Sequence, residues 1–449
     1  MSKATDSLGP RLSAVDTQML EYQRPNTNLW TESAWLLTFD GRSPTIAELR
    51  EQVGSSLPLL PPLREKVRYS KLGLSRPRWI RDPGFDLSWH VREADAPRFR
   101  SEEGWLRLAD ELLGSPLDRE RPLWRIWLVP ADGKERFALL FHLNHALADG
   151  HSALNILRLL LAAEVDRGHP PPGPSSRRKH DGLRARLREG LEAAKSIVAA
   201  GRLLYPPAPT IPVLNRPLGP RRHTLTVDVP MRTVMEIATG LGCFPNDVYL
   251  TAVAGGLRRW LGGRGEAPSE LTLQAGIPIK TRSRTERQGL GNHFSGIRLP
   301  LPVGEGSHLA RLRRIQVETK RITAGRVARG GELMGRAHDL LPRQLLTPLA
   351  RMEWGPKAVN LVVSHLALPG DLRQCLGRPL TQLYCWTPLF EDNTISFVAA
   401  QGLNGTMTIN LLVEPDLVPD ASVLEAGILE TVDDLHAALA GEALVAGRS

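Results

Sequence analysis

Cysteine and long apolar runs are scarce in this sequence. Its 449 residues include three cysteines, Cys243, Cys375 and Cys385, which are too few for a disulfide framework, and no Cys-x-x-Cys pair indicates a zinc site. No stretch approaches the ~18 consecutive apolar residues of a membrane span, and the N-terminal segment lacks the apolar core of a signal peptide. We therefore expect a cytoplasmic protein whose membrane contact, where it occurs, is peripheral.

Motifs for nucleotides and nucleic acids are also missing. The sequence has no Gly-x4-Gly-Lys-Ser/Thr loop, and the glycine-rich stretch 262–268 ends in proline rather than at a helix start. Aromatic residues are only 5% of the chain, and no zinc finger or RNP-like motif occurs, so nucleic acid is excluded as a partner. The excess of 57 basic over 48 acidic residues favours anionic partners such as phosphates, CoA or membrane surfaces.

The length and the distribution of proline predict two domains and a linker. A chain of 449 residues exceeds one typical domain, and 42% apolar residues suffice for a buried core. Prolines at both ends of 166–222 forbid regular structure there, which divides the chain into 1–165, the linker 166–222, and 223–449. Within the linker, 183–198 has the pattern of a basic amphipathic helix, which packs across the domains or lies on a membrane.

Both halves mix strand and helix patterns, so the expected fold class is α/β or α+β. Residues 123–129 and 135–145 read as a hairpin of buried strands, followed by a helix from Ser152. In the second half, helix patterns cover 246–261 and 309–322. Strand patterns cover 223–230, 271–279, 297–303, 358–366, 394–403 and 406–413.

The stretch HLNHALADG, from His142 to Gly150, carries the clearest chemical signal. His145 can take a proton from a hydroxyl nucleophile and return it to a leaving group, because imidazole titrates near neutrality. Asp149 can fix the loop through backbone N–H groups or a cation, and Gly150 lets the backbone turn. Taken alone, the pair fits a structural histidine beside a turn as well as a catalytic base.

Two other chemistries fit these residues poorly. His142 and His145 point to opposite faces of a strand, so a metal site that uses them with Asp149 and His151 is not expected. Gly150-His151-Ser152 begins like a nucleophile elbow, but Leu154 stands where the second glycine is required, which argues against a serine hydrolase.

The stretch NHALADG resembles the HHxxxDG signature of CoA-dependent acyltransferases and peptide-synthetase condensation domains. The surrounding segments resemble the wax ester synthase/diacylglycerol acyltransferase family in order and spacing over nearly the whole chain. These segments are RLSAVDTQMLEYQRPNTN, DPGFDLSWHV, SPLDRERPLWRIWLV, CFPNDVYLTAVAGGLRRWL, GIPIKTRSRTERQGLGNHFSGIRLPLP and VVSHLALPG.

This resemblance implies a fold and a reaction. It implies two similar α/β domains, with mixed sheets and helices, that form an active-site tunnel at their interface. Acyl-CoA would enter as a substrate from one side and an alcohol or diacylglycerol from the other, and His145 would deprotonate the hydroxyl for direct attack on the thioester. Neither an acyl-enzyme, a cofactor nor a metal is expected, which agrees with a chain that offers a base but no activated nucleophile.

The resemblance also assigns roles to individual residues. Asp149 matches the signature aspartate, whose role is structural, commonly through a salt bridge to an arginine of the other half. Arg282, in PIKTR, is the candidate partner, although it also fits an exposed arginine. Asn292 matches the family's GN motif near the tunnel and could donate a hydrogen bond to the developing oxyanion. Asn246 and Asp247 match the ND motif, and helix capping explains them equally well.

Asn144 departs from the signature, which has a histidine at this position. The first histidine mainly supports the loop, and an asparagine amide can both donate and accept hydrogen bonds, so we expect Asn144 to be a scaffold residue. Two alternatives keep the fold but change the function. One is a tailoring enzyme that esterifies a natural product, with CoA or an acyl carrier protein as the donor. The other is a catalytically weak homologue that binds lipid or membranes. An anionic membrane or lipid-droplet surface is a further expected partner.

Overall fold

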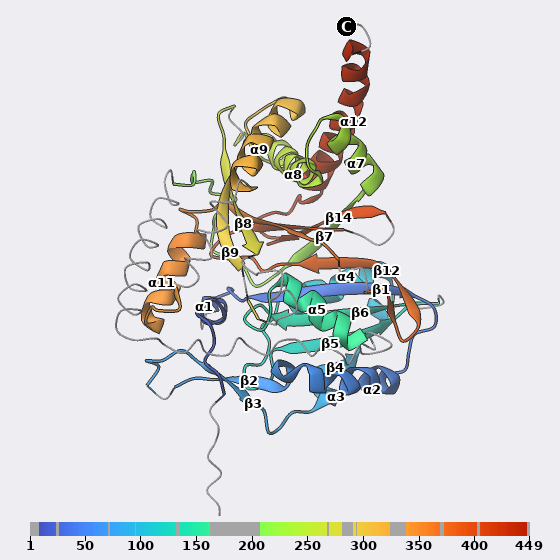
Figure 1. The fold of residues 1–449 in the computed structure, drawn as a ribbon, viewed down its shortest axis with the longest axis vertical. Helices are drawn as coiled ribbons and strands as arrows, with labels where there is room; N and C mark the ends of the chain where they lie inside the picture. The colour runs from blue at the N-terminus through green and yellow to red at the C-terminus, as the bar shows by residue number, and fades with distance from the viewer. Residues whose placement is uncertain are drawn as a thin grey trace, which may run out of the picture.

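The structure is a computed structural model of the whole chain. It describes residues 9–23, 27–70, 72–94, 96–131, 135–161, 207–266, 269–280, 291–292, 294–323, 338–368, 372–401 and 405–446. The predicted basic helix 183–198 and Arg282 lie outside these residues. Figure 1 shows two groups of strands, one above the other, with helices around them.

The first sheet has six strands and is built around β1. Its order is β11-β12-β1-β6-β5-β4, and only β4 and β5 run parallel. The strands are β1 (Glu32–Asp40), β4 (Val91–Glu93), β5 (Trp124–Pro130), β6 (Arg136–Asn144), β11 (Gln374–Cys375) and β12 (Arg378–Trp386). The predicted hairpin 123–145 is confirmed as β5 and β6, and burial of nearly every residue of β6 explains its continuous apolar run.

The second sheet also has six strands, in the order β7-β14-β13-β10-β8-β9. Its strands are β7 (His223–Pro230), β8 (Leu273–Lys280), β9 (Phe294–Leu301), β10 (Leu361–Leu366), β13 (Ile395–Gln401) and β14 (Thr406–Val413). The strand patterns of the second half are thereby confirmed. Since β10 runs parallel to both β8 and β13, this sheet is mixed like the first, and the two halves are similar.

Sheet membership crosses the expected boundary at residue 223. β11 and β12 come from the second half of the sequence, yet they extend the first sheet, where Ala34 pairs with Trp386 across β1 and β12. The hydroxyl groups of Thr38 and Thr381 lie 2.8 Å apart across the same pair. The edge of β1 needs a hydrogen-bonding partner, and a strand more than 300 residues away supplies it.

Helices pack around both sheets. The principal helices are α1 (Ala14–Tyr22), α2 (Ile46–Ser56), α4 (Glu102–Leu113), α5 (Gly150–Leu161), α7 (Met231–Gly240), α8 (Pro245–Gly262), α9 (His308–Thr323), α11 (Arg343–Trp354) and α12 (Ser422–Ala446). α8 and α12 pack so closely that a Cβ at Gly256 would lie 2.7 Å from the Leu424 carbonyl oxygen. Within the described residues, no helix is both long and apolar enough to cross a membrane.

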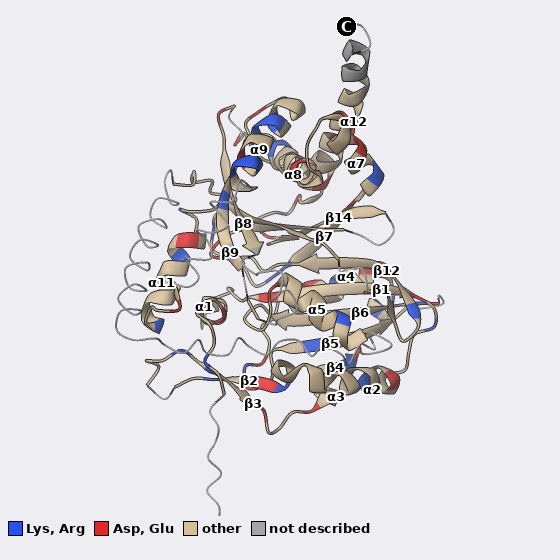
Figure 2. Cartoon of the chain, viewed as in Figure 1, with Lys and Arg blue, Asp and Glu red and all other residues tan. Residues whose placement is uncertain are grey.

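The remaining described elements are short. They are β2 (Glu65–Arg68), β3 (Arg78–Arg81), α3 (Leu87–His90) and the 3-10 helices Leu57–Leu59, Pro61–Arg64 and Pro97–Phe99. β2 and β3 form a separate two-stranded sheet. The positions of lysines and arginines, drawn in blue in Figure 2, are prominent on α9.

Candidate active site

His145 lies in the loop that joins β6 to α5. Its backbone N–H donates to the Thr31 carbonyl at 2.7 Å, and the Asn144 N–H donates to the Leu123 carbonyl at 3.1 Å. Backbone hydrogen bonds therefore tie the start of the loop to two other segments of the chain, at Thr31 and at Leu123. This position places the His145 ring between the two sheets.

Asn144 is fully buried and uses both ends of its amide. Its Nδ2 donates to Glu32 Oε1 at 3.0 Å, and its Oδ1 accepts from the Ala146 N–H at 2.9 Å. Burial raises the pKa of Glu32, against the opposing effect of the Asn144 hydrogen bond. The side chain thus links β1 to the loop that carries His145, a contact pattern typical of a scaffold residue.

Asp149 caps helix α5 and ties it to the second half. Its Oδ1 accepts from the Ser152 N–H at 2.8 Å, the hydrogen bond expected of an N-cap aspartate. The Ser152 hydroxyl donates to the Gly291 carbonyl at 2.7 Å, beside Asn292. A Cβ at Gly150 would lie 2.9 Å from a methyl carbon of Leu366 on β10. The signature glycine therefore allows the two halves to approach closely.

Asn292 fixes the orientation of the His145 ring. Its Nδ2 donates to Asp16 Oδ1 at 2.8 Å and to the His145 carbonyl at 2.7 Å, and its Oδ1 lies 3.0 Å from His145 Nδ1. Because the carboxylate and the carbonyl can only accept, the amide oxygen must face the ring, and Nδ1 carries the proton. His145 Nε2 is then left with its lone pair.

This network corrects the expected role of Asn292. Both of its amide hydrogens are engaged by Asp16 and the His145 carbonyl, so none is available for a developing oxyanion. Asn292 instead supports the His145 ring. The sequence located the residue, but its role depends on the groups around it.

The surroundings of His145 favour the neutral imidazole. Burial lowers the pKa of His145, and the charge of Asp149 and the hydrogen bond to Asn292 offset part of this effect. The rings of Phe294 and Phe390 lie edge to face against the imidazole, with their centroids 5.7 Å and 6.3 Å from its centroid. A neutral ring with a free Nε2 can accept a proton at physiological pH.

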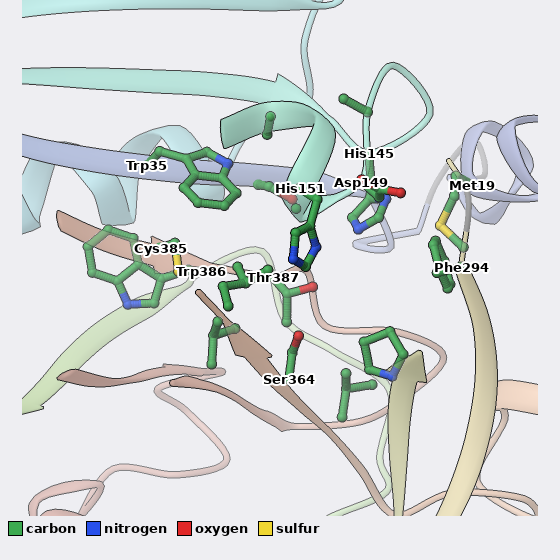
Figure 3. Close-up of a pocket in the computed structure, with 18 of the residues that line it drawn as sticks. Met19, Trp35, His145, Asp149, His151, Phe294, Ser364, Cys385, Trp386 and Thr387 are labelled. Atoms are coloured by element: carbon green, nitrogen blue, oxygen red, sulfur yellow. The ribbon is translucent and has the colours of Figure 1, made fainter. Parts of the chain in front are cut away.

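A cavity of about 90 Å³ opens beside His145 between the two sheets. Figure 3 shows Met19 and Phe294 next to His145, with Trp35 and Trp386 at the other end of the pocket. Both sheets contribute to a lining that is mostly apolar. The remaining lining residues include Leu143, Pro278, Ile279, Val362, Leu366 and Val398, with the polar side chains His151, Ser364, His365 and Thr387.

Two expected site residues lie away from this pocket, and neither is among the described residues that line it. Asn246 is in the first turn of α8. Asp247 is buried, accepts from the Phe244 N–H at 2.9 Å, and accepts from the Thr319 hydroxyl at 2.7 Å. The capping alternative therefore describes Asp247, and the proposed Asp149–Arg282 pair stays a prediction because Arg282 is outside the described residues. The described part of the chain holds no cluster of three metal-ligating side chains.

The sequence analysis missed Asp16, which completes the His145 network from α1. Ser13 and Asp16 form a capping box, in which the Ser13 hydroxyl accepts from the Asp16 N–H at 3.0 Å. The pattern Ser-x-x-Asp is a recognisable helix-start signal. It locates the helix, but it gives no indication that the aspartate also reaches Asn292.

Solved structures share this fold. A wax ester synthase/diacylglycerol acyltransferase from Marinobacter aquaeolei aligns with a TM-score of 0.68 at 19% identity, covering 96% of this chain and 100% of that one. The first condensation domain of the CDA synthetase aligns with a TM-score of 0.68 at 15% identity, covering 96% and 97%. The molecule therefore has the two-halved α/β fold of acyltransferases and condensation domains.

Sequence comparisons define the family. Residues 12–204 match the wax ester synthase/diacylglycerol acyltransferase catalytic domain, and residues 290–436 match the WS/DGAT C-terminal domain. A Mycobacterium tuberculosis protein named as a diacylglycerol O-acyltransferase is 31% identical over 71% of this chain and 74% of its own. A second one is 27% identical over 95% and 96%. The chain belongs to this family, and it is an acyltransferase that acts on a hydroxyl acceptor.

Proposed function

We propose that the enzyme transfers an acyl group from acyl-CoA to the hydroxyl of diacylglycerol or of a long-chain alcohol, with His145 Nε2 as the general base. The observation that supports this most is the hydrogen-bonded series from Asp16 through Asn292 to His145 Nδ1. It fixes the tautomer that a base needs and directs the free nitrogen away from the network. The same logic orients the histidine of catalytic triads, where a carboxylate rather than an amide holds the ring.

The reaction proceeds by direct transfer. Nε2 takes the proton of the acceptor hydroxyl while the hydroxyl oxygen attacks the thioester carbonyl carbon. The tetrahedral intermediate collapses to the ester and expels the CoA thiolate, which recovers the proton from Nε2. The imidazole thus accepts the hydroxyl proton and later donates it to the thiolate, and the cycle closes without an acyl-enzyme.

The pocket lining supports lipid substrates. Its aromatic and aliphatic walls, from Trp35 and Trp386 to Phe294, suit hydrocarbon chains, because burial of apolar surface is favourable at about 25 cal/mol per Å². The starter condensation domain of rhizomide synthetase, which shares the fold, was solved in complex with C8-CoA. A CoA thioester is therefore the proposed donor, and an acyl carrier protein is the alternative for the assay to separate.

Substitution of His145 tests the proposal. His145→Ala should lower turnover by roughly 10²–10⁴-fold, the usual contribution of a general base, while acyl-CoA still binds. His151→Ala is the matched control, since His151 also lines the pocket and is the rival base. The assay follows free thiol and ester together over a series of acyl-CoA lengths, alcohols and diacylglycerol. A larger loss in His151→Ala than in His145→Ala would reject this assignment.

A further inference from the structure

Exposed apolar side chains are concentrated on one side of the molecule. Among the described residues, ten large apolar side chains are exposed, and six of them lie on α11, just before it, or on the β2–β3 hairpin. These six are Tyr69, Leu72, Leu74, Leu340, Leu345 and Met352, and we call them the α11–hairpin surface. Leu72 is 82% exposed and Leu74 is 65% exposed. A contiguous exposed apolar patch of this kind usually marks an interaction site.

Helix α11 presents this surface in a regular pattern. Leu346 and Ala350 face inward and are buried, whereas Leu345 and Met352 are 53% and 56% exposed. These two exposed positions are seven residues apart, with the exposed Pro348 between them, which places all three on one face of the helix. The outer face of α11 is therefore apolar, although it meets solvent.

The hairpin and α11 are held together by specific contacts. Arg343 donates to the Gly73 carbonyl at 2.6 Å and forms an ion pair with Glu21 of α1. Arg76 forms an ion pair of 2.7 Å with Asp339. Figure 1 shows α11 and the tip of the hairpin on the same side of the molecule. The two segments that carry the six side chains therefore lie next to one another.

The charge around this surface suits an anionic lipid layer. The segment 65–81, which spans β2 and β3, contains six lysines and arginines and one acidic residue, and two of these cations, Lys66 and Arg76, are ion-paired with Asp82 and Asp339. Basic side chains that flank exposed apolar ones are typical of segments that lie in the interface of a membrane, where the apolar groups insert and the cations meet lipid headgroups.

The same helix leads to the active site. Trp354, the last residue of α11, lines the pocket, and its ring lies 6.4 Å from that of Phe294, which contacts His145. α11 also packs on α1, where Tyr22 donates to the Ala350 carbonyl at 2.9 Å. One side of α11 therefore faces solvent, and its C-terminal residue lines the pocket beside the aromatic ring that contacts His145.

We propose that the α11–hairpin surface docks onto an anionic lipid surface, so that the water-insoluble acceptor passes along α11 to His145 without crossing water. This inference rests on the proposed lipid acceptor. It places the docking site on described residues, distinct from the basic segment 183–198.

Vesicle binding tests the surface directly. The variant carries Leu72→Ser, Leu345→Ser and Met352→Ser, and its control carries Met235→Ser and Val317→Ser. The control residues are exposed apolar side chains on α7 and α9, which lie toward the other end of the molecule in Figure 1. The full-length protein is sedimented with phosphatidylcholine vesicles that contain or lack phosphatidylglycerol, at low and high salt.

We expect the triple variant to bind anionic vesicles at least about tenfold more weakly than wild type, because three apolar groups no longer insert. The control should bind like wild type, and binding of wild type should weaken at high salt. Activity on a water-soluble short-chain alcohol should be unchanged in the triple variant. Activity on diacylglycerol in vesicles should fall at least about tenfold.

Several results would overturn the proposal. These are equal vesicle binding by the triple variant and wild type, an equal loss in the control, and a wild-type dimer that the triple variant dissociates in light scattering. A wild type that binds vesicles but acylates neither acceptor would instead reject the proposed function, so the two failures are distinguishable.

Discussion

Removing the carboxylate of Asp16 should impair catalysis from a position that does not itself line the pocket. Asp16 Oδ1 accepts from Asn292 Nδ2 at 2.8 Å, and Asn292 in turn holds His145 Nδ1. In Asp16→Ala the amide loses a partner that can only accept. The His145 carbonyl is then the one acceptor that still holds the amide hydrogens. The amide rotates more readily and presents N–H to Nδ1, which favours the imidazole tautomer whose Nε2 is protonated and cannot act as a base.

The strength of the lost hydrogen bond sets the size of the decrease in kcat/KM. A hydrogen bond to a charged group contributes about 1.5–3 kcal/mol, which corresponds to about 10- to 150-fold in kcat/KM if the transition state bears the full loss. We expect the decrease in kcat, with the KM for acyl-CoA nearly unchanged, because Asp16 touches neither the pocket nor the thioester. Asp16→Asn keeps an oxygen that can accept and should recover part of the activity.

Ser13→Ala is the control for damage to the helix. Asp16 also belongs to the capping box of α1, in which its Oδ2 accepts from the Ser13 N–H at 3.3 Å. Ser13→Ala removes the serine cap, at a cost of about 1 kcal/mol in stability, but leaves the bond to Asn292. Thiol release and thermal unfolding are measured on all three variants. Equal losses of kcat in Ser13→Ala and Asp16→Ala would refute the positioning role.

Three further predictions concern stability, the signature loop and the pocket. Burial lowers the pKa of His142 from 6.5 to about 3. The free energy of unfolding should therefore be intact above about pH 6.5 and fall by about 1.4 kcal/mol per pH unit between pH 6.5 and 3, where only the unfolded state binds the proton. Acid titration of His142→Leu should show a shallower fall, and an equal slope in the two proteins would contradict this. Asn144→Ala should lose about 1–3 kcal/mol of stability, because buried partners are left unsatisfied, with a smaller loss of turnover than in His145→Ala. Asn144→His should keep substantial activity, whereas an inactive wild type rescued by this histidine would indicate a decayed site. A Cβ at Gly296 would collide with the ring of Trp354, so Gly296→Ala should shift the preferred chain length of the acceptor, and an unchanged product profile in an alcohol panel would show that Trp354 does not shape the site.

The sequence by itself determined the elements whose pattern is local. Alternation and apolar runs located β5, β6, β7 and β14, and helical periodicity located α8 and α9, because these signals depend on near neighbours in the chain. The motif around His145 and Asp149 was equally legible, since a base, a cap and a glycine stand within six residues. The order of the resembling segments then identified the family.

Only the tertiary structure decided which distant segments meet. The placement of β12 beside β1 joins residues more than 300 positions apart, and no local pattern states which strand will satisfy a sheet edge. Asp16 and Asn292 are 276 residues apart, and the amide of Asn292 became a support for His145 because an acceptor lies on its other side. The chemistry of a polar side chain depends on the partners that surround it, and folding rather than sequence order brings those partners together.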